Sequence, residues 1–307
     1  MYLILGAVVA MLWANSPFAA GYEALISIEA IKGIAIFAFF LSLGIELREE
    51  ITHGSLAKPR QAIVPIFAAI GGMLVPVAIY SIINQALPSA AGWGVPMSTD
   101  VAFALAVLAL AGKFLPSPVR IFLLTVAVVD DSLTILMIAL FFSSTFHALS
   151  VVSLAGVVIG LFLPGGQKIT GWLTPTVNYV ALPVFALFSA GVNVQGLGSS
   201  FASSAITIGV IAAMVIGKPL GVLGTTWLVT KSGLGKLAAG IKWADLLSIG
   251  SLFGMCFTVA LLMSELSFGQ QHTEHAIANL SVFIGSITSA LLAVIALQLR
   301  KRAYVSR

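Results

Sequence analysis

Charged residues are scarce in this chain of 307 residues: they make up 8% of it, as 11 acids and 15 lysines and arginines. Cysteine is almost missing as well, and the single Cys256 excludes an internal disulfide. With 59% hydrophobic residues and a mean hydropathy of +1.09, the chain has too little polar surface for a soluble domain. The net charge of +4 comes from basic residues spread among short loops, which does not indicate nucleic-acid binding. The composition predicts a single polytopic membrane domain, residues 1–307.

Apolar windows long enough to cross a bilayer recur along the whole chain. Turn residues separate them, for example at Pro116-Ser117-Pro118 and Pro164-Gly165-Gly166. We therefore predict an all-α protein with about ten transmembrane helices. Their expected ranges are 1–15, 31–47, 61–83, 95–112, 118–143, 149–164, 175–191, 204–230, 245–267 and 276–299.

The basic residues test this count, because cytoplasmic loops of membrane proteins are enriched in lysine and arginine. With ten helices and a cytoplasmic N-terminus, 13 of the 15 basic residues fall in inner loops; Lys32 lies near the first outer loop and Lys218 within a helix. This separation predicts a multi-pass protein with both termini in the cytoplasm. The inner residues are Arg48, Lys58, Arg60, Lys113, Arg120, Lys168, Lys231, Lys236, Lys242, Arg300, Lys301, Arg302 and Arg307.

Two groups of three predicted helices, at 61–143 and 204–301, run in opposite directions through the membrane. Such inverted-topology repeats are typical of secondary transporters. We predict that the two triplets form a core, and that the helices in 1–60 and 149–191 form an interface panel beside it. The halves share no residue-level identity, so the symmetry follows from topology alone.

The central helix of each triplet is interrupted by residues that are unusual for a plain lipid-facing span. The first contains Pro96-Met97-Ser98-Thr99-Asp100, and the second contains glycines and polar residues between Gly250 and Thr258. Paired broken helices in inverted repeats surround a site near the bilayer midplane. We therefore predict two broken helices that cross there.

Asp130 and Asp131 lie in the middle of an apolar stretch that runs from Ile121 to Phe142. A charge in hydrocarbon is costly, and ionisable residues there usually mark ion pathways or proton relays. Neighbours on a helix point about 100° apart, so one aspartate can face a cation while the other meets a partner. The alternative, an exposed helix end, is weak because both flanks are apolar.

Asp100 follows Thr99 at the first interruption, where oxygen side chains and freed carbonyls suit a hard cation such as Na⁺ or Li⁺. Asp100 can also cap the helix that follows, and the two roles can coexist. Lys218 lies near the middle of 204–230, too deep for snorkelling to an interface. Because burial of an unpaired lysine is costly, we expect it to pair with an aspartate or to carry protons.

Three glutamates surround Arg48 at the inner end of the second helix, namely Glu46, Glu49 and Glu50. Two interpretations stay open: a solvated helix end, or a role of Glu46 and Glu50 in cation attraction and pH response. The four histidines lie at or near predicted loops, so no metal role is expected for them. We expect the residues near the last outer loop to be solvated; they are Glu265, His272, Glu274 and His275, while His53 and His147 lie at other loops.

At these residues the chain resembles the NhaA family of Na⁺/H⁺ antiporters, itself a standard example of inverted-repeat architecture. An Asp-Asp pair alone is a weak signal, whereas the ordered set of motifs from the second to the ninth helix is highly specific. The matching stretches are Gly44–Glu50, Ser98–Leu105, Val126–Asp131, Leu182–Ala186, Ala190–Val192, Gly217–Gly221, and Gly254 with Phe257–Thr258.

The resemblance implies exchange of Na⁺ or Li⁺ for H⁺ across the inner membrane of a bacterial cell, in the service of pH homeostasis. It implies a transporter and not an enzyme, with no resident cofactor. Asp131 would be the principal cation ligand and proton acceptor, and Asp130 would pair with Lys218 or share the proton traffic, with both aspartates at the Na⁺ site. Thr99 would supply an oxygen, and Asp100 would offset the partial positive charge of two half-helix ends. The expected partners are Na⁺, Li⁺, H⁺ and the lipid bilayer.

The chain also departs from the family pattern. Family members usually have about twelve helices, and the stretch between Asp131 and Ser153 is short enough to lack one helical hairpin. Residues 15–29 are too few for the β-hairpin through which family members dimerise, which argues against a homodimer. Thr174-Pro175-Thr176 replaces the acids and histidines of the usual pH-sensing cluster, and Cys256 stands where a glycine is typical.

Two other functions stay open from the sequence. One is a Na⁺-coupled symporter of an organic anion on a related fold, although Lys218 is the only obvious buried cation that such an anion could meet. The other is a non-transporting member in which the shortened middle has removed activity. A channel is less favoured, because the charges form no repeated ring and no filter motif is present.

Overall fold

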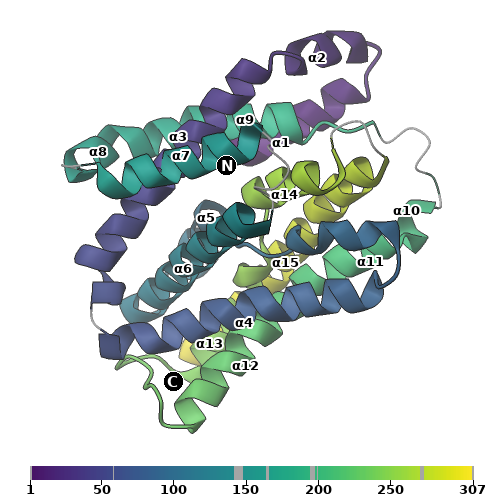
Figure 1. Ribbon diagram of the computed structural model, residues 1–307. Coiled ribbons are helices and arrows are strands. Elements are labelled where there is room, and N and C mark those ends of the chain that lie inside the picture. Colours follow the sequence, from purple (N-terminus) through teal and green to yellow (C-terminus); the bar gives the residue numbers. More distant parts are fainter. Residues whose placement is uncertain are drawn as a thin grey trace. The chain divides into compact units, whose positions relative to one another are not determined.

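The computed structural model describes residues 2–57, 59–141, 148–163, 166–193, 198, 200–269 and 273–305. Several residues discussed above lie outside this part of the chain: Lys58, His147, the Pro164-Gly165 turn, His272 and Arg307. The described residues form helices, turns and connecting segments, with no strand among them (Figure 1). The predicted all-α class is therefore confirmed.

Helices follow one another along the chain with short connections. The α-helices are α1 (Tyr2–Ala14), α2 (Ala19–Ile26), α3 (Glu29–Thr52), α4 (Pro59–Ile83), α5 (Val101–Ala111), α6 (Ser117–Phe141), α7 (Ala148–Phe162), α8 (Gly166–Thr176), α9 (Leu182–Ser189), α10 (Ser200–Ser203), α11 (Ala205–Ala212), α12 (Lys218–Lys231), α13 (Trp243–Ile249), α14 (Thr258–Phe268) and α15 (Thr273–Val305). Tighter or wider turns are η1 (Ser55–Ala57), η2 (Pro88–Gly94), η3 (Val177–Ala181), η4 (Ala213–Gly217) and η5 (Gly250–Gly254).

Every one of the ten predicted membrane segments has a helical counterpart in this order. In the described residues, six helices are long and apolar enough to cross a bilayer, and a seventh span is bent by 42° between Trp243–Gly254 and Thr258–Phe268. Three further apolar helices are shorter: Leu5–Ala14, Val101–Ala111 and Val151–Phe162. The chain is thus a multi-pass membrane protein. The connection between α1 and α3 contains α2, a short helix.

The chain divides into two compact units. Unit 1 comprises Met1–His53 and Thr134–Ser200, and its helices α3 and α7 meet backbone to backbone (Figure 1). A methyl group added to Gly44 would collide with the carbonyl of Val157, and one added to Gly160 would collide with that of Leu41. Gly156 and Gly160 are four residues apart on one face of α7, the spacing that lets membrane helices approach closely.

Unit 2 comprises Gly54–Leu133 and Phe201–Arg307. Here α4 crosses α12 through Gly71 and Gly221, each of which has the other's carbonyl where a side chain would begin. The core of this unit gathers Leu123 and Val126 of α6 with Leu252 and Phe253 of η5. The polar residues of α6, of α12 and of the breaks therefore lie in the same unit. Glycines at the helix crossing and apolar side chains in the core hold them there.

Two helices contain a π-helical turn directly before an X-Pro pair. The amide of Leu182 donates to the carbonyl of Val177 ahead of Pro183, and the amide of Lys218 donates to that of Ala213 ahead of Pro219. Proline lacks an N–H and its ring clashes with the carbonyl four residues earlier, so a wider turn relieves the crowding. Lys218 thus follows a local irregularity that its own sequence encodes.

Candidate cation and proton site

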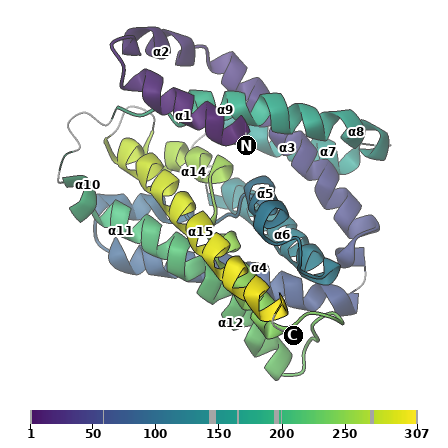
Figure 2. The same cartoon turned by 180° about the vertical axis from the view of Figure 1, so that it is seen from behind.

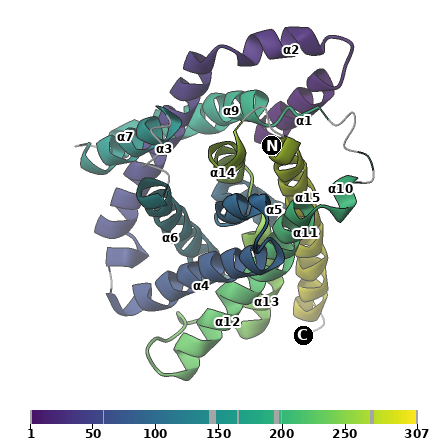
Figure 3. The same ribbon diagram turned by 45° about the vertical axis from the view of Figure 1, so that its right-hand side comes forward.

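Both predicted helix interruptions are real breaks, and they lie against each other in unit 2 (Figure 3). The first is the non-helical stretch before α5, and the second runs from η5 to the start of α14. The Asp100 amide donates to the Met255 carbonyl at 2.7 Å, and the Thr99 hydroxyl donates to the Phe253 carbonyl at 2.9 Å. Each break therefore satisfies backbone groups that an intact helix would have paired internally.

The Asp100 carboxylate bridges the two helices that restart after the breaks. One oxygen accepts a hydrogen bond from the Phe103 amide at 3.1 Å and so caps α5, and the other accepts from the Thr258 hydroxyl at 2.8 Å at the first residue of α14. Helix N-termini carry partial positive charge, which a carboxylate offsets. The capping role is observed, while a cation-binding role for Asp100 stays a prediction.

Ser98 and Cys256 also meet between the breaks. The Ser98 Oγ lies 3.1 Å from the Cys256 Sγ, and both side chains are buried. The Cys256 carbonyl accepts a hydrogen bond from the Ser286 hydroxyl of α15. The only cysteine in the chain therefore lies at the centre of the crossing.

Asp130 and Lys218 form a buried ion pair between α6 and α12. The Lys218 Nζ lies 2.6 Å from the Asp130 Oδ2, with relative exposures of 0% and 2%. A buried charge is tolerable only when paired and hydrogen-bonded, so each side chain depends on the other. The π turn η4 immediately precedes the lysine that makes this contact.

Thr99 connects this ion pair with the broken helices. Its hydroxyl and its backbone interact with the Asp130 carboxylate. A hydroxyl has a single proton, so donation to the Phe253 carbonyl leaves its oxygen lone pairs for a donor or a cation. The structure thus brings together Thr99, Asp100, Asp130 and Lys218, which the sequence spreads between positions 99 and 218.

Asp131 is also buried, at 4% exposure, one residue after Asp130 on α6. Adjacent helical residues point about 100° apart, so Asp131 faces a different direction from the Asp130 carboxylate. Ionisable residues buried in apolar membrane helices usually mark ion pathways, and Asp131 has this property.

Glu46 and Glu50 belong to α3 of unit 1 and are half-buried. The Ser42 hydroxyl lies 3.4 Å from a Glu46 carboxylate oxygen, one turn earlier on the same helix. Arg48 donates to the carbonyl of Leu163, just after the end of α7. This places a cation at a helix C-terminus, where the helix dipole favours it.

The structure contradicts two predictions and shows a buried acid that the sequence reading missed. Lys218 is not the only buried cation, because Lys32 of α3 is buried as well, at 2% exposure. His275 is not solvated: it is 5% exposed, with its ring nitrogens 3.0 Å from the Ser264 hydroxyl and 3.1 Å from the Asn279 amide nitrogen. It lies in the first turn of α15 on the side that faces α14, which proximity to a loop could not reveal. Asp245 is fully buried as well. The sequence feature that could have indicated its burial is its position at the start of the apolar window 245–267.

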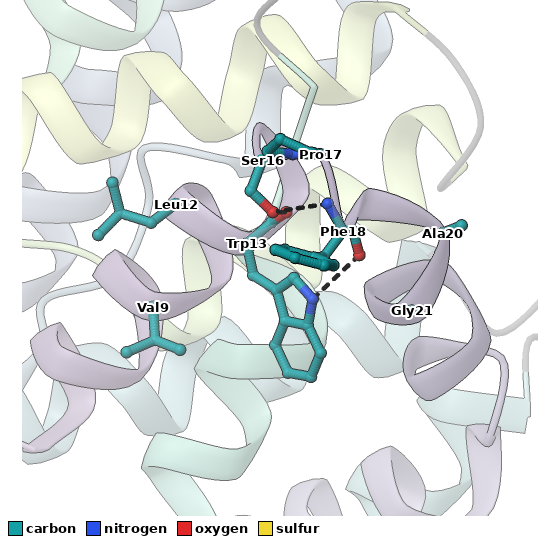
Figure 4. A pocket seen from close by; sticks show the side chains of 8 residues that line it. All are labelled: Val9, Leu12, Trp13, Ser16, Pro17, Phe18, Ala20 and Gly21. Carbon is teal, nitrogen blue, oxygen red and sulfur yellow. Dashed lines mark hydrogen bonds between the residues drawn. The ribbon is translucent and has the colours of Figure 1, made fainter.

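A shallow hollow of about 800 Å³ lies on unit 1, away from these acids in the sequence (Figure 4). It is mostly apolar, and the Trp13 indole and the Phe18 amide make local hydrogen bonds at its edge. None of its lining residues is ionisable, so it has no group to bind or exchange a cation. The lining residues are Val9, Leu12, Trp13, Ser16, Pro17, Phe18, Ala20 and Gly21.

Crossed broken helices with a buried aspartate–lysine pair define the chain as a secondary transporter of the inverted-repeat class. Comparison with known proteins narrows this class. The family model described as Na⁺/H⁺ antiporter 1 matches residues 1–165 and 152–297. The chain belongs to the NhaA family of Na⁺/H⁺ antiporters.

Named relatives cover almost the whole chain. Na⁺/H⁺ antiporter NhaA of Arthrobacter sp. (strain FB24) is 36% identical over 386 residues, with 98% of this chain and 83% of the relative covered. The NhaA of Mycolicibacterium smegmatis is 36% identical over 369 residues, covering 98% and 85%. That of Citrobacter koseri is 34% identical over 360 residues, covering 94% and 92%.

These alignments are longer than the 307 residues of the chain, so the relatives contain segments that this chain lacks. The family model itself matches in two pieces that overlap at residues 152–165. This overlap begins where the stretch between Asp131 and Ser153 ends, and the missing helical hairpin in that stretch stays a prediction.

Proposed function

We propose that the protein exchanges Na⁺, or Li⁺, for H⁺ across the inner membrane of a bacterial cell, with both termini in the cytoplasm. The carrying observation is the buried Asp130–Lys218 pair beside the crossed breaks. When a cation arrives, such a pair can release a proton, or its carboxylate can leave the lysine. Membership of the NhaA family and the names of its relatives support the same exchange.

The proposed site uses oxygen ligands, which hard monovalent cations prefer. Asp131 is the principal ligand and proton acceptor, and Thr99 supplies a further oxygen. Asp130 alternates between Lys218 and the transported cation, so binding of Na⁺ weakens the ion pair. Asp100 keeps the breaks in register by its bonds to Phe103 and Thr258.

Competition between cation and proton couples the two fluxes. When the aspartates are ionised, Na⁺ binds; when they are protonated, Na⁺ leaves. The charges of the two carboxylates and of Lys218 act on one another, since these groups are neighbours in a low-dielectric setting. The apparent KM for Na⁺ therefore rises as pH falls. Alternating access then needs a movement of the core triplets, 61–143 and 204–301, against the panel helices.

Two roles outside this site are further parts of the proposal. Glu46 and Glu50 contribute to cation attraction or pH response at the inner end of α3. The short loop of residues 15–29 argues for a protein that acts without the family's dimerisation hairpin. Neither role is needed for the exchange chemistry at Asp130 and Asp131.

The test is exchange in proteoliposomes, measured as ²²Na⁺ uptake against an imposed pH gradient. The wild-type protein should exchange Na⁺ and Li⁺, and Asp131→Asn should lose exchange by at least about a hundredfold, because an amide can neither accept the proton nor neutralise the cation. Glu274→Gln, an exposed acid on α15, serves as a matched control and should retain exchange. Undiminished exchange in Asp131→Asn would overturn the site, and Na⁺ uptake that requires an organic acid would favour a symporter.

A further inference from the structure

Helix α15 holds the second broken helix at three levels. At one end of α15, Arg300 and Tyr304 reach Asp245 of α13. In the middle, Ser286 donates to the carbonyl of Cys256 at the break. At the other end, His275 lies 3.0 Å from the Ser264 hydroxyl of α14. Figure 2 shows α15 as a long helix, with α14 beside one of its ends.

The contact at Asp245 is the strongest of the three. The carboxylate is fully buried, and one oxygen lies 2.8 Å from the Arg300 Nε. The Tyr304 hydroxyl lies 3.2 Å from both oxygens, and the guanidinium stacks 4.7 Å from the Tyr304 ring centroid. Charge-assisted bonds of this kind are stronger than neutral ones, and a buried carboxylate needs them. We call these three residues the Asp245 clasp.

The clasp acts on the ion site through a short path. Helix α13 has only seven residues, and η5 follows it directly. The carbonyl of Phe253 in η5 accepts the hydrogen bond of Thr99, and the Met255 carbonyl accepts that of the Asp100 amide. A seven-residue helix has little rigidity of its own, because helices this short are marginal without tertiary contacts. Whatever orients α13 therefore orients the carbonyls that meet Thr99 and Asp100.

We propose that the Asp245 clasp is a positioning device for the cation site. It fixes α13 against α15 and so sets where the Phe253 carbonyl holds the Thr99 hydroxyl. Asp245, Arg300 and Tyr304 are positioning residues, since they act on the proposed site only through α13. This inference rests on the proposed exchange function for its effect on affinity, but its effect on the packing of the break does not.

Cys256 reports on that packing without any transport. As the only cysteine, buried against Ser98 at the break, it should react slowly with a small thiol reagent. The rate of its modification would be measured in the wild type, Arg300→Gln, Tyr304→Phe, Arg300→Lys and Arg302→Gln. Arg302 lies exposed two residues beyond Arg300 and is the matched control.

The expected result is modification about fivefold faster in Arg300→Gln and Tyr304→Phe, as local opening of α13 exposes the thiol, with Arg302→Gln within about twofold of wild type. Arg300→Lys keeps the charge and should fall between wild type and Arg300→Gln. Tyr304→Phe removes only a hydroxyl, so it decides the question if Arg300→Gln does not fold. Equal rates in the clasp variants and the control would overturn the clasp.

The second readout is the apparent KM for Na⁺ against the maximum rate of exchange. The clasp variants should raise KM by about three- to tenfold and change the maximum rate by less than about twofold, because binding geometry and not the amount of folded protein is altered. Faster thiol modification with an unchanged KM would overturn the link to cation affinity. If the wild type shows no exchange, the proposed function fails, while the thiol rates still decide the clasp.

Discussion

The Lys218 ammonium lies 2.6 Å from the Asp130 carboxylate with both side chains buried, so neither charge has bulk water as an alternative partner. Such a pair is strongly interdependent: removal of one member leaves a buried, uncompensated charge. The pair is also adjacent to Thr99 and the broken helices. This adjacency links the stability of the core to the occupancy of the proposed site.

The first prediction concerns this interdependence. Asp130→Asn should lower the free energy of unfolding by about 3–5 kcal/mol, because Lys218 loses its buried counter-charge. Lys218→Gln should cost a similar amount. The double variant should cost less than the sum of the two, since it removes both charges together. Thermal unfolding in detergent measures all three, and strictly additive losses would contradict the prediction.

The second prediction concerns the Thr99 hydroxyl. Thr99→Val keeps the shape of the side chain but removes the hydrogen bond to the Phe253 carbonyl and a proposed cation ligand. A loss of about 1.4 kcal/mol of binding corresponds to a tenfold weaker apparent affinity for Na⁺ and Li⁺. Thr99→Ser retains the hydroxyl and should stay close to wild type. The measurement is the apparent KM for each cation, and equal values for the Val and Ser variants would remove Thr99 from the site.

The third prediction tests the close approach of α3 and α7. Gly160→Ala places a methyl group against the Leu41 carbonyl, so the helices must separate, at a cost of about 1–3 kcal/mol for overpacking. Gly33→Ala on α3 has no atom within 4 Å of the new methyl group and should be neutral or slightly stabilising. The midpoint of thermal unfolding separates the two. Equal midpoints would show that the contact tolerates a side chain.

The fourth prediction concerns alkaline pH. Tyr22 lies in α2, where its hydroxyl donates to the Leu187 carbonyl at 2.7 Å, and burial raises its pKa to about 12. The unfolded chain ionises this group near its ordinary value of 10.0. The folded state therefore binds the proton more tightly, and the stabilisation is complete below pH 10 and is lost as pH rises toward 12.

Tyr22→Phe provides the comparison for this effect, since it keeps the ring and removes the titrating group. The difference in unfolding midpoint between wild type and Tyr22→Phe should be constant up to about pH 9.5 and should shift against the wild type above pH 10. A difference that does not change with pH would show that Tyr22 ionises alike in both states.

Much of the fold followed from apolar windows and from the residues that interrupt them. The two breaks were predictable because Ser98-Thr99-Asp100 and the glycines near Gly254 disfavour a continuous helix. The π turn before Lys218 was not predicted, although Pro219 provides its cause. The π turn lets the helix continue although the proline lacks an N–H. The local sequence Gly217-Lys218-Pro219 is equally compatible with a kink and with a wider turn, so it does not predict which one forms.

The residues whose burial the sequence did not show are those buried by contacts between helices. His275 was predicted to be solvated because a loop is near, yet its partner Ser264 lies on the preceding helix. Asp245 stood at the edge of a predicted window, and its partners Arg300 and Tyr304 are more than fifty residues away. Charge and hydropathy indicate how costly burial is, but only tertiary contact shows how that cost is offset.

The crossing of α4 and α12 has a consequence for handling the protein outside its membrane. Gly71 and Gly221 meet through backbone atoms, so the contact depends on van der Waals packing and not on release of ordered solvent. Replacement of lipid by detergent leaves such a contact nearly unchanged. Lys218 lies one helical turn before Gly221, so the lysine should keep its register toward α6 in micelles as it does in a bilayer.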